Sequence, residues 1–137
     1  MNVVKELVIF DLDGVILNSK ANMKIAWTAV QNEFGIKTPF TDYFDLIGLP
    51  FREILAKLGI NEHVHEIETM FRVASMENLS TATFYNGVEE TLGKLAGAGI
   101  KLGIVTSKDR LRTNAVLALL LVDFITIQTP IDGIRGK

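Results

Sequence analysis

Two aspartates spaced two residues apart are the residues of this sequence best placed to do chemistry together. Asp11 and Asp13 follow the apolar, partly β-branched segment 7–10, which is typical of a buried strand. If the chain turns after this strand, both carboxylates can face one pocket. Gly14 makes such a turn easier, because glycine adopts backbone conformations that other residues avoid. Such oxygen ligands suit Mg²⁺, and one carboxylate can attack phosphorus while the other shuttles a proton. Taken alone, an Asp-x-Asp pair is a weak signal, and its spacing favours a pair that only caps a helix or binds solvent.

A second polar group follows another apolar segment. Leu102-Gly103-Ile104-Val105 runs directly into Thr106-Ser107-Lys108. In parallel α/β sheets, ligands bind beyond the carboxyl ends of the strands. We therefore expect Thr106 to lie at the same edge of a sheet as Asp11.

The elements that must position these residues follow from hydrophobic periodicity and from breakers. Strands are expected at 7–10, 102–105 and 124–127. Helices are expected at 19–35 with Ser19 as N-cap, at 50–58, 62–79 and 88–96, and from an N-cap at Asp109 to about residue 121. The pattern predicts an α/β fold with a parallel sheet, interrupted after its first strand by helices. We expect residues 1–17 and 84–137 to form the core and residues 18–83 to form an inserted helical cap.

Composition narrows the class of protein. The 137 residues are 48% hydrophobic and 22% charged, which is typical of a folded soluble domain. A net charge of −2 without a cluster of basic residues gives no case for nucleic-acid binding. The absence of cysteine excludes a thiol nucleophile and fits the cytoplasm. The longest apolar run, 115–122, is far shorter than the roughly 20 residues of a membrane span.

Taken in order, the strand, Asp-Leu-Asp-Gly, the helical insert and the second strand ending in Thr-Ser-Lys resemble the haloacid dehalogenase superfamily. The resemblance is to the subclass with a helical cap after the first motif, such as phosphoglycolate phosphatases and β-phosphoglucomutases. It implies a Rossmann-like three-layer core whose first three strands are present. It implies Asp11 as nucleophile, Asp13 as general acid/base, and Mg²⁺ bound by Asp11 and the main-chain carbonyl of Asp13. The Thr106 hydroxyl would hold a phosphoryl oxygen, and Lys137 would begin the Gly-Lys-Pro motif that neutralises charge.

The resemblance also bears on the substrate. Gly14 and Ser107 are expected to bind the substrate. Arg52 is the cap residue best suited to a carboxylate or second phosphate, although an exposed arginine on a helix face fits it equally well. Asp13 favours phosphoryl transfer over carbon–halogen cleavage. Met23 stands where mutases of this subclass have a histidine, which disfavours mutase activity.

The predicted function is therefore Mg²⁺-dependent hydrolysis of a small phosphorylated metabolite through an aspartyl-phosphate. The sequence ends before the acidic fourth motif of the superfamily, so we expect a C-terminally truncated chain. This leaves an alternative from another class: a catalytically incompetent fragment or interaction module that self-associates through its unpaired first strand.

Overall fold

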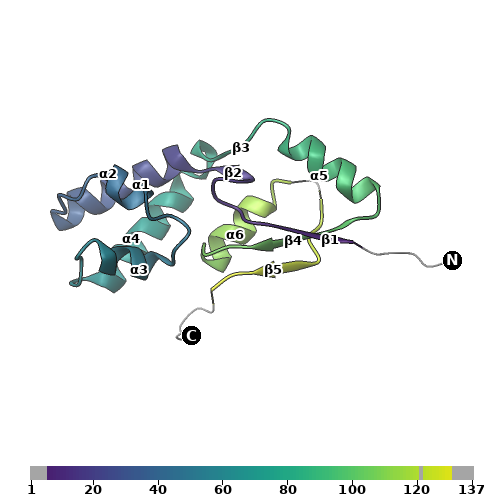
Figure 1. The fold of residues 1–137 in the computed structure, drawn as a ribbon. Helices are drawn as coiled ribbons and strands as arrows, with labels where there is room; N and C mark the ends of the chain where they lie inside the picture. The colour runs from purple at the N-terminus through teal and green to yellow at the C-terminus, as the bar shows by residue number, and fades with distance from the viewer. Residues whose placement is uncertain (1–5, 121, 131–137) are drawn as a thin grey trace. The chain divides into compact units, whose positions relative to one another are not determined.

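The computed structural model describes residues 6–120 and 122–130 of the chain, so Lys137 lies outside the described residues. Its internal contacts divide the chain into two compact units, Met1–Asn18 with Phe84–Lys137, and Ser19–Thr83 (Figure 1). These limits fall within one residue of the sequence-based boundaries. Whether the two units behave as separate domains stays a prediction.

The first unit is built on a three-stranded parallel sheet. Its strands are β1 (Leu7–Phe10), β4 (Lys101–Val105) and β5 (Thr126–Gln128), in the order β1-β4-β5. Phe10 is in register with Ile104, and Val105 with Gln128. The α/β class and the parallel sheet are confirmed. β4 is the central strand, and its three middle residues are buried.

Two helices complete the first unit, α5 (Val88–Gly97) and α6 (Arg110–Leu117). The helix expected to reach residue 121 ends earlier, because Leu119 and Leu120 bond three residues back, to Val116 and Leu117. Such tight bonds mark the end of an α-helix. The strand expected at 124–127 is observed as β5, which starts and ends later in the sequence, at Thr126 and Gln128.

Two short strands, β2 (Leu17–Asn18) and β3 (Thr83–Phe84), were not predicted. They pair as a two-stranded sheet where the chain leaves the first unit and returns to it. Beside them, the Tyr85 N–H donates to the Ile16 carbonyl at 3.2 Å. Strands of two residues are too short to leave a periodic signal in the sequence.

The second unit is helical. It contains α1 (Lys20–Phe34), α2 (Phe40–Phe44), α3 (Phe51–Lys57), α4 (Val64–Glu77) and a short 3₁₀ helix, η1 (Leu79–Thr81). The predicted helices at 19–35, 50–58 and 62–79 are confirmed to within two residues at each end. α1 ends at Gly35, whose φ of 65° is left-handed and therefore suits glycine. α2 was missed because five residues after a proline show no helical period.

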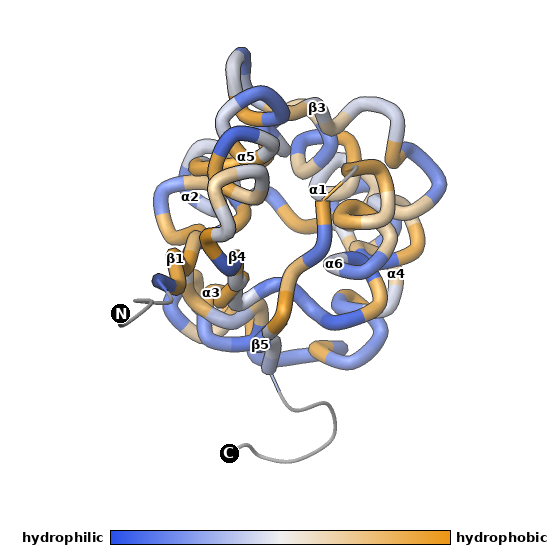
Figure 2. Tube along the Cα trace, turned by 90° about the vertical axis from the view of Figure 1, so that its right-hand side faces the viewer, coloured by the Kyte–Doolittle hydropathy of each residue, from blue (hydrophilic) through white to orange (hydrophobic). Residues whose placement is uncertain are grey.

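Aromatic rings form the centre of the second unit. Trp27 is fully buried, stacks on Tyr43 at 4.8 Å between ring centroids, and donates its indole N–H to the Thr38 carbonyl at 2.9 Å. Phe71 packs against Tyr43 at 5.3 Å and against Phe51 at 4.8 Å. Aromatic pairs at these distances add to the stabilisation from buried area. Polar and apolar stretches alternate along the helices in Figure 2, as expected for helices that each bury one face.

No helix within residues 6–120 and 122–130 is long and apolar enough to cross a membrane.

Candidate active site

The loop that leaves β1 is closed by its own hydrogen bonds. The buried Leu12 directs its carbonyl to the Leu17 N–H at 2.9 Å, and the Gly14 N–H donates to the Leu17 carbonyl at 2.9 Å. Gly14 has a φ of 83°, a conformation that residues with a Cβ atom rarely adopt. The chain therefore turns at Gly14, the residue expected from the sequence to ease the turn after the two aspartates.

Asp11 and Thr106 follow neighbouring strands at the same sheet edge. Asp11 directly follows the last residue of β1, and Thr106 directly follows the last residue of β4. Phe10 is in register with Ile104, so the two strands end at nearly the same level. The Asp11 side chain is exposed, and its Oδ1 accepts the Leu12 N–H at 2.7 Å. Thr106 is buried, with its N–H bonded to the Gln128 carbonyl at 3.0 Å. The structure thus places both groups where the sequence expected them.

Lys108 brings a positive charge to Asp13. Its Nζ lies 3.2 Å from Oδ1 and 3.3 Å from Oδ2 of the aspartate. The two side chains are 4% and 13% exposed, so the ion pair is largely shielded from water. Burial lowers the pKa of Lys108 below its usual value, and the charge of Asp13 opposes that shift. The sequence places Lys108 close to Thr106 but gives it no predicted role.

The segment from Thr106 to Thr113 is held by local hydrogen bonds. The Lys108 N–H donates to Thr106 Oγ1 at 3.1 Å, and Thr113 Oγ1 donates to the Lys108 carbonyl at 3.4 Å. Asp109 caps α6, since its Oδ2 accepts the Arg112 N–H at 3.0 Å and its Oδ1 accepts the Arg112 Nε–H. The predicted cap at Asp109 is confirmed. Lys108 therefore extends from a backbone that is fixed on both sides.

The carboxylates on the loop after β1 decide whether Mg²⁺ could bind there. Among the described residues, no group of three or more histidine, cysteine or acidic side chains gathers around one point. Mg²⁺ does not need such a cage, because it keeps several waters and takes one or two carboxylates together with substrate phosphate. The exposed Asp11 carboxylate fits that requirement. The Asp13 carboxylate fits it poorly, because an ammonium group already lies against both of its oxygens.

The remaining predicted site residues lie elsewhere or make no decisive contact. Arg52, at the start of α3 in the second unit, pairs with Glu68 at 3.0 Å and approaches His65 Nδ1 at 3.4 Å, with its side chain 56% exposed. Ser107 is half-buried, and Gly14 is exposed. The substrate roles of Arg52, Ser107 and Gly14 stay predictions, and Lys137 lies outside the described residues.

Comparison with known proteins decides the family. A family model described as haloacid dehalogenase-like hydrolase matches residues 8–133. The chain belongs to the haloacid dehalogenase-like hydrolase family. The resemblance found in the sequence is thereby confirmed, and so is the Rossmann-like fold that it implied.

Relatives of this haloacid dehalogenase-like chain carry different names. It is 30% identical over 137 residues to the tyrosine-protein kinase PtkA of Mycobacterium tuberculosis, covering 96% of this chain and 47% of the relative. It is 28% identical to the phosphoglycolate phosphatase of Aquifex aeolicus, covering 83% and 54%. A solved hydrolase structure from Pseudomonas syringae superimposes with a TM-score of 0.83 at 24% identity, covering 98% and 64%. The chain therefore spans about half the length of these two curated relatives.

Proposed function

We propose that the protein carrying this chain is a Mg²⁺-dependent phosphatase that hydrolyses a small phosphorylated metabolite in the cytoplasm. The observation that carries the proposal is the exposed carboxylate of Asp11 directly after β1, at the sheet edge where Thr106 directly follows β4. The second carboxylate, Asp13, lies two residues away with an ammonium partner. Family membership and the phosphatase relative from Aquifex aeolicus support phosphoryl chemistry.

The reaction assigns a different task to each side chain. An Asp11 oxygen attacks phosphorus, the bond to the leaving oxygen breaks, and an aspartyl-phosphate forms. Asp13 enters this step carrying a proton, delivers it to the leaving oxygen, and regains one from the water that cleaves the acyl phosphate. The Thr106 hydroxyl donates to a phosphoryl oxygen. Asp11 and the main-chain carbonyl of Asp13 would hold Mg²⁺, which would supply positive charge to stabilise the phosphoryl oxygens.

The substrate class is proposed from the relatives and from the second unit. A phosphatase named for phosphoglycolate suggests a small ester that carries a second anionic group. Arg52 would suit such a group, because a guanidinium pairs with a carboxylate or phosphate through two parallel hydrogen bonds. Its present partner Glu68 also pairs with Arg72 at 3.3 Å, so Glu68 would keep a counter-ion if Arg52 turned to a ligand.

The test uses the full-length protein, a panel of phosphate esters and Mg²⁺. Asp11→Asn should lower kcat by a factor of about 10³ or more, because the amide is a poor nucleophile. Asp123→Asn, which changes an aspartate of the same unit outside the site, is the matched control and should leave kcat unchanged. Removing Mg²⁺ with a chelator should abolish turnover, and adding it back should restore it. Full activity in Asp11→Asn would rule the proposal out.

The kinase relative requires one further arm of the assay. Incubation with ATP and a tyrosine peptide tests whether phosphoryl transfer to an acceptor, rather than to water, is the main reaction. The rate of phosphopeptide formation is compared with the rate of phosphate release from each ester. If the phosphopeptide forms faster than phosphate is released from any ester, the protein is a kinase and the phosphatase proposal is wrong.

A second candidate function rests on β1. In the described part of the chain β1 pairs only with β4, and its Leu7 and Ile9 side chains are 47% and 53% exposed. An exposed apolar edge strand invites pairing with a further strand. The 137-residue chain would then act as an interaction module that dimerises through β1. Light scattering should show a dimer that Ile9→Lys converts to monomer, whereas a monomer that hydrolyses esters contradicts this candidate.

A further inference from the structure

We propose that Lys108 is the positioning residue of Asp13: it fixes the carboxylate for proton transfer and separates its task from that of Asp11. The inference rests on the proposed phosphatase function and goes beyond it, because neither the sequence pattern nor the family description gives Lys108 a role. It is drawn from the contacts of Lys108 within the first unit.

The geometry is that of a fixed ion pair. The Lys108 ammonium lies at nearly equal distances, 3.2 and 3.3 Å, from the two Asp13 oxygens, so it defines the orientation of the whole carboxylate. The backbone of Lys108 is held by Thr106 Oγ1 on one side and by Thr113 on the other. The lysine side chain is 4% exposed, so water has little access to the ammonium. A charge held in this way loses little further freedom when a substrate binds.

The loop that carries Asp13 explains why such a support is needed. Asp13 precedes Gly14, whose positive φ shows that the backbone turns sharply there. Misplacing a catalytic group by about 1 Å can lower the rate by about 10²-fold. Lys108 is separated from Asp13 by 95 residues, so it ties this loop to the segment that follows β4.

The same contact divides the work between two carboxylates of identical type. A cation already occupies both oxygens of Asp13, whereas the Asp11 carboxylate is exposed. With Lys108 against Asp13, the Asp11 carboxylate is the one that would hold the metal and attack the phosphorus.

The experiment uses the full-length protein and compares an alkyl phosphate with p-nitrophenyl phosphate. An alkoxide leaving group needs a proton from Asp13, whereas p-nitrophenolate leaves readily without one. Lys108→Met should lower kcat about 10- to 100-fold on the alkyl phosphate and less than about 3-fold on p-nitrophenyl phosphate. KM should change little on either substrate, and Lys108→Arg should restore part of the loss by replacing the cation.

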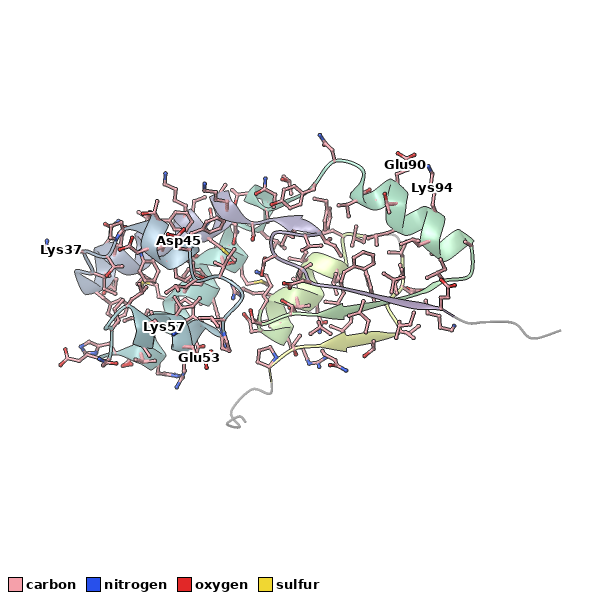
Figure 3. All side chains as sticks on the ribbon, viewed as in Figure 1. Lys37, Asp45, Glu53, Lys57, Glu90 and Lys94 are labelled. Carbon is pink, nitrogen blue, oxygen red and sulfur yellow. The ribbon has the colours of Figure 1, made fainter. Side chains whose placement is uncertain are left out.

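A double variant separates positioning from a general structural effect. Lys108→Met combined with Asp13→Asn should be no slower on the alkyl phosphate than Asp13→Asn alone, because the residue that Lys108 positions is then absent. The urea midpoint of the double variant should likewise fall by less than the sum of the two single shifts. Lys94→Met is the matched control. Lys94 lies on α5 beside Glu90 (Figure 3), and its side chain is 75% exposed. Its replacement should leave kcat on both substrates unchanged.

Several results would overturn the inference. Equal loss on both substrates would mark Lys108→Met as a structural lesion, and multiplicative losses in the double variant would show that Lys108 acts independently of Asp13. If Lys108→Met does not fold, Lys108→Arg takes its place, with a loss of about 3- to 10-fold expected on the alkyl phosphate alone. Full activity of that variant on both substrates, or equal loss on both, refutes positioning. An inactive wild-type protein instead marks failure of the proposed function, and the inference falls with it.

Discussion

Replacing Asn22 by alanine should destabilise the second unit strongly, because a single buried side chain makes several of its hydrogen bonds. Asn22 lies in α1 and is 2% exposed. Its Nδ2 donates to the Ser75 carbonyl at 3.0 Å and to the Asn78 carbonyl at 2.9 Å, and its Oδ1 accepts the Ser75 hydroxyl at 2.6 Å. Thr81 Oγ1 lies 3.3 Å from the same nitrogen. One side chain therefore joins α1 to the end of α4 and to η1.

The magnitude follows from the bonds that are lost. Each net hydrogen bond contributes about 0.5 to 1.5 kcal/mol, so losing three of them should lower the free energy of unfolding by about 2 to 4 kcal/mol. That is a large share of the roughly 5 to 15 kcal/mol by which small domains are stable. Urea unfolding followed by circular dichroism measures the change directly.

The matched control for this prediction is Asn61→Ala. Asn61 is exposed, and its Nδ2 lies 3.5 Å from the Gly59 carbonyl, so its loss should change stability by no more than about 0.5 kcal/mol. Asn22→Asp should be at least as destabilising as Asn22→Ala, because a carboxylate cannot donate to the two carbonyls. A loss below about 1 kcal/mol for Asn22→Ala would refute the reasoning, since it would mean that water replaces all three bonds at no cost.

Three further substitutions test the first unit by chemical or thermal unfolding. Gly93→Ala should stabilise it by about 0.5 to 1 kcal/mol, because the added methyl group on α5 meets no atom within 4 Å and alanine favours helix; destabilisation would contradict this. Gly103→Ala should destabilise it by about 1 to 3 kcal/mol, because the new Cβ would lie 2.8 Å from Thr126 Cγ2, and adding Thr126→Ser should recover part of the loss. Asp109→Ala should lower stability by at least about 1 kcal/mol, since α6 loses its cap and Arg112 a buried carboxylate, and Asp109→Asn should be milder.

The sequence predicts those parts of the fold that are determined by neighbouring residues. Both ends of α1 could be predicted, because Ser19 directly precedes the helix and Gly35 adopts the left-handed conformation that ends it. The end of α6 could not, because the run 115–122 is uniformly apolar and contains neither a breaker nor a polar residue. The helix stops there where its hydrogen bonds tighten, which the order of residue types does not encode.

The same distinction applies to the candidate site. Asp11 and Thr106 were placed correctly because each directly follows an apolar strand, and parallel strands present their carboxyl ends at one edge. The partner of Asp13 was missed because the two residues are 95 positions apart and the contact depends on the reach and burial of one lysine side chain. The sequence shows the lysine in Thr106-Ser107-Lys108, but only the folded side chains show that it contacts Asp13.

Two aspartates that the sequence presents as near equivalents acquire different surroundings in the fold. Asp11 is exposed and bonds to the N–H of its own loop, whereas Asp13 is enclosed and bonds to a buried ammonium. Chemistry that needs one carboxylate as a nucleophile and another as a proton carrier depends on such a difference, because identical groups in identical surroundings would have identical reactivity. The surroundings of Asp13 differ because of Lys108, whose backbone is held by Thr106 at the end of β4 and by Thr113 in α6. The division of roles that we propose for Asp11 and Asp13 should therefore be lost when Lys108 is replaced, even though both aspartates remain.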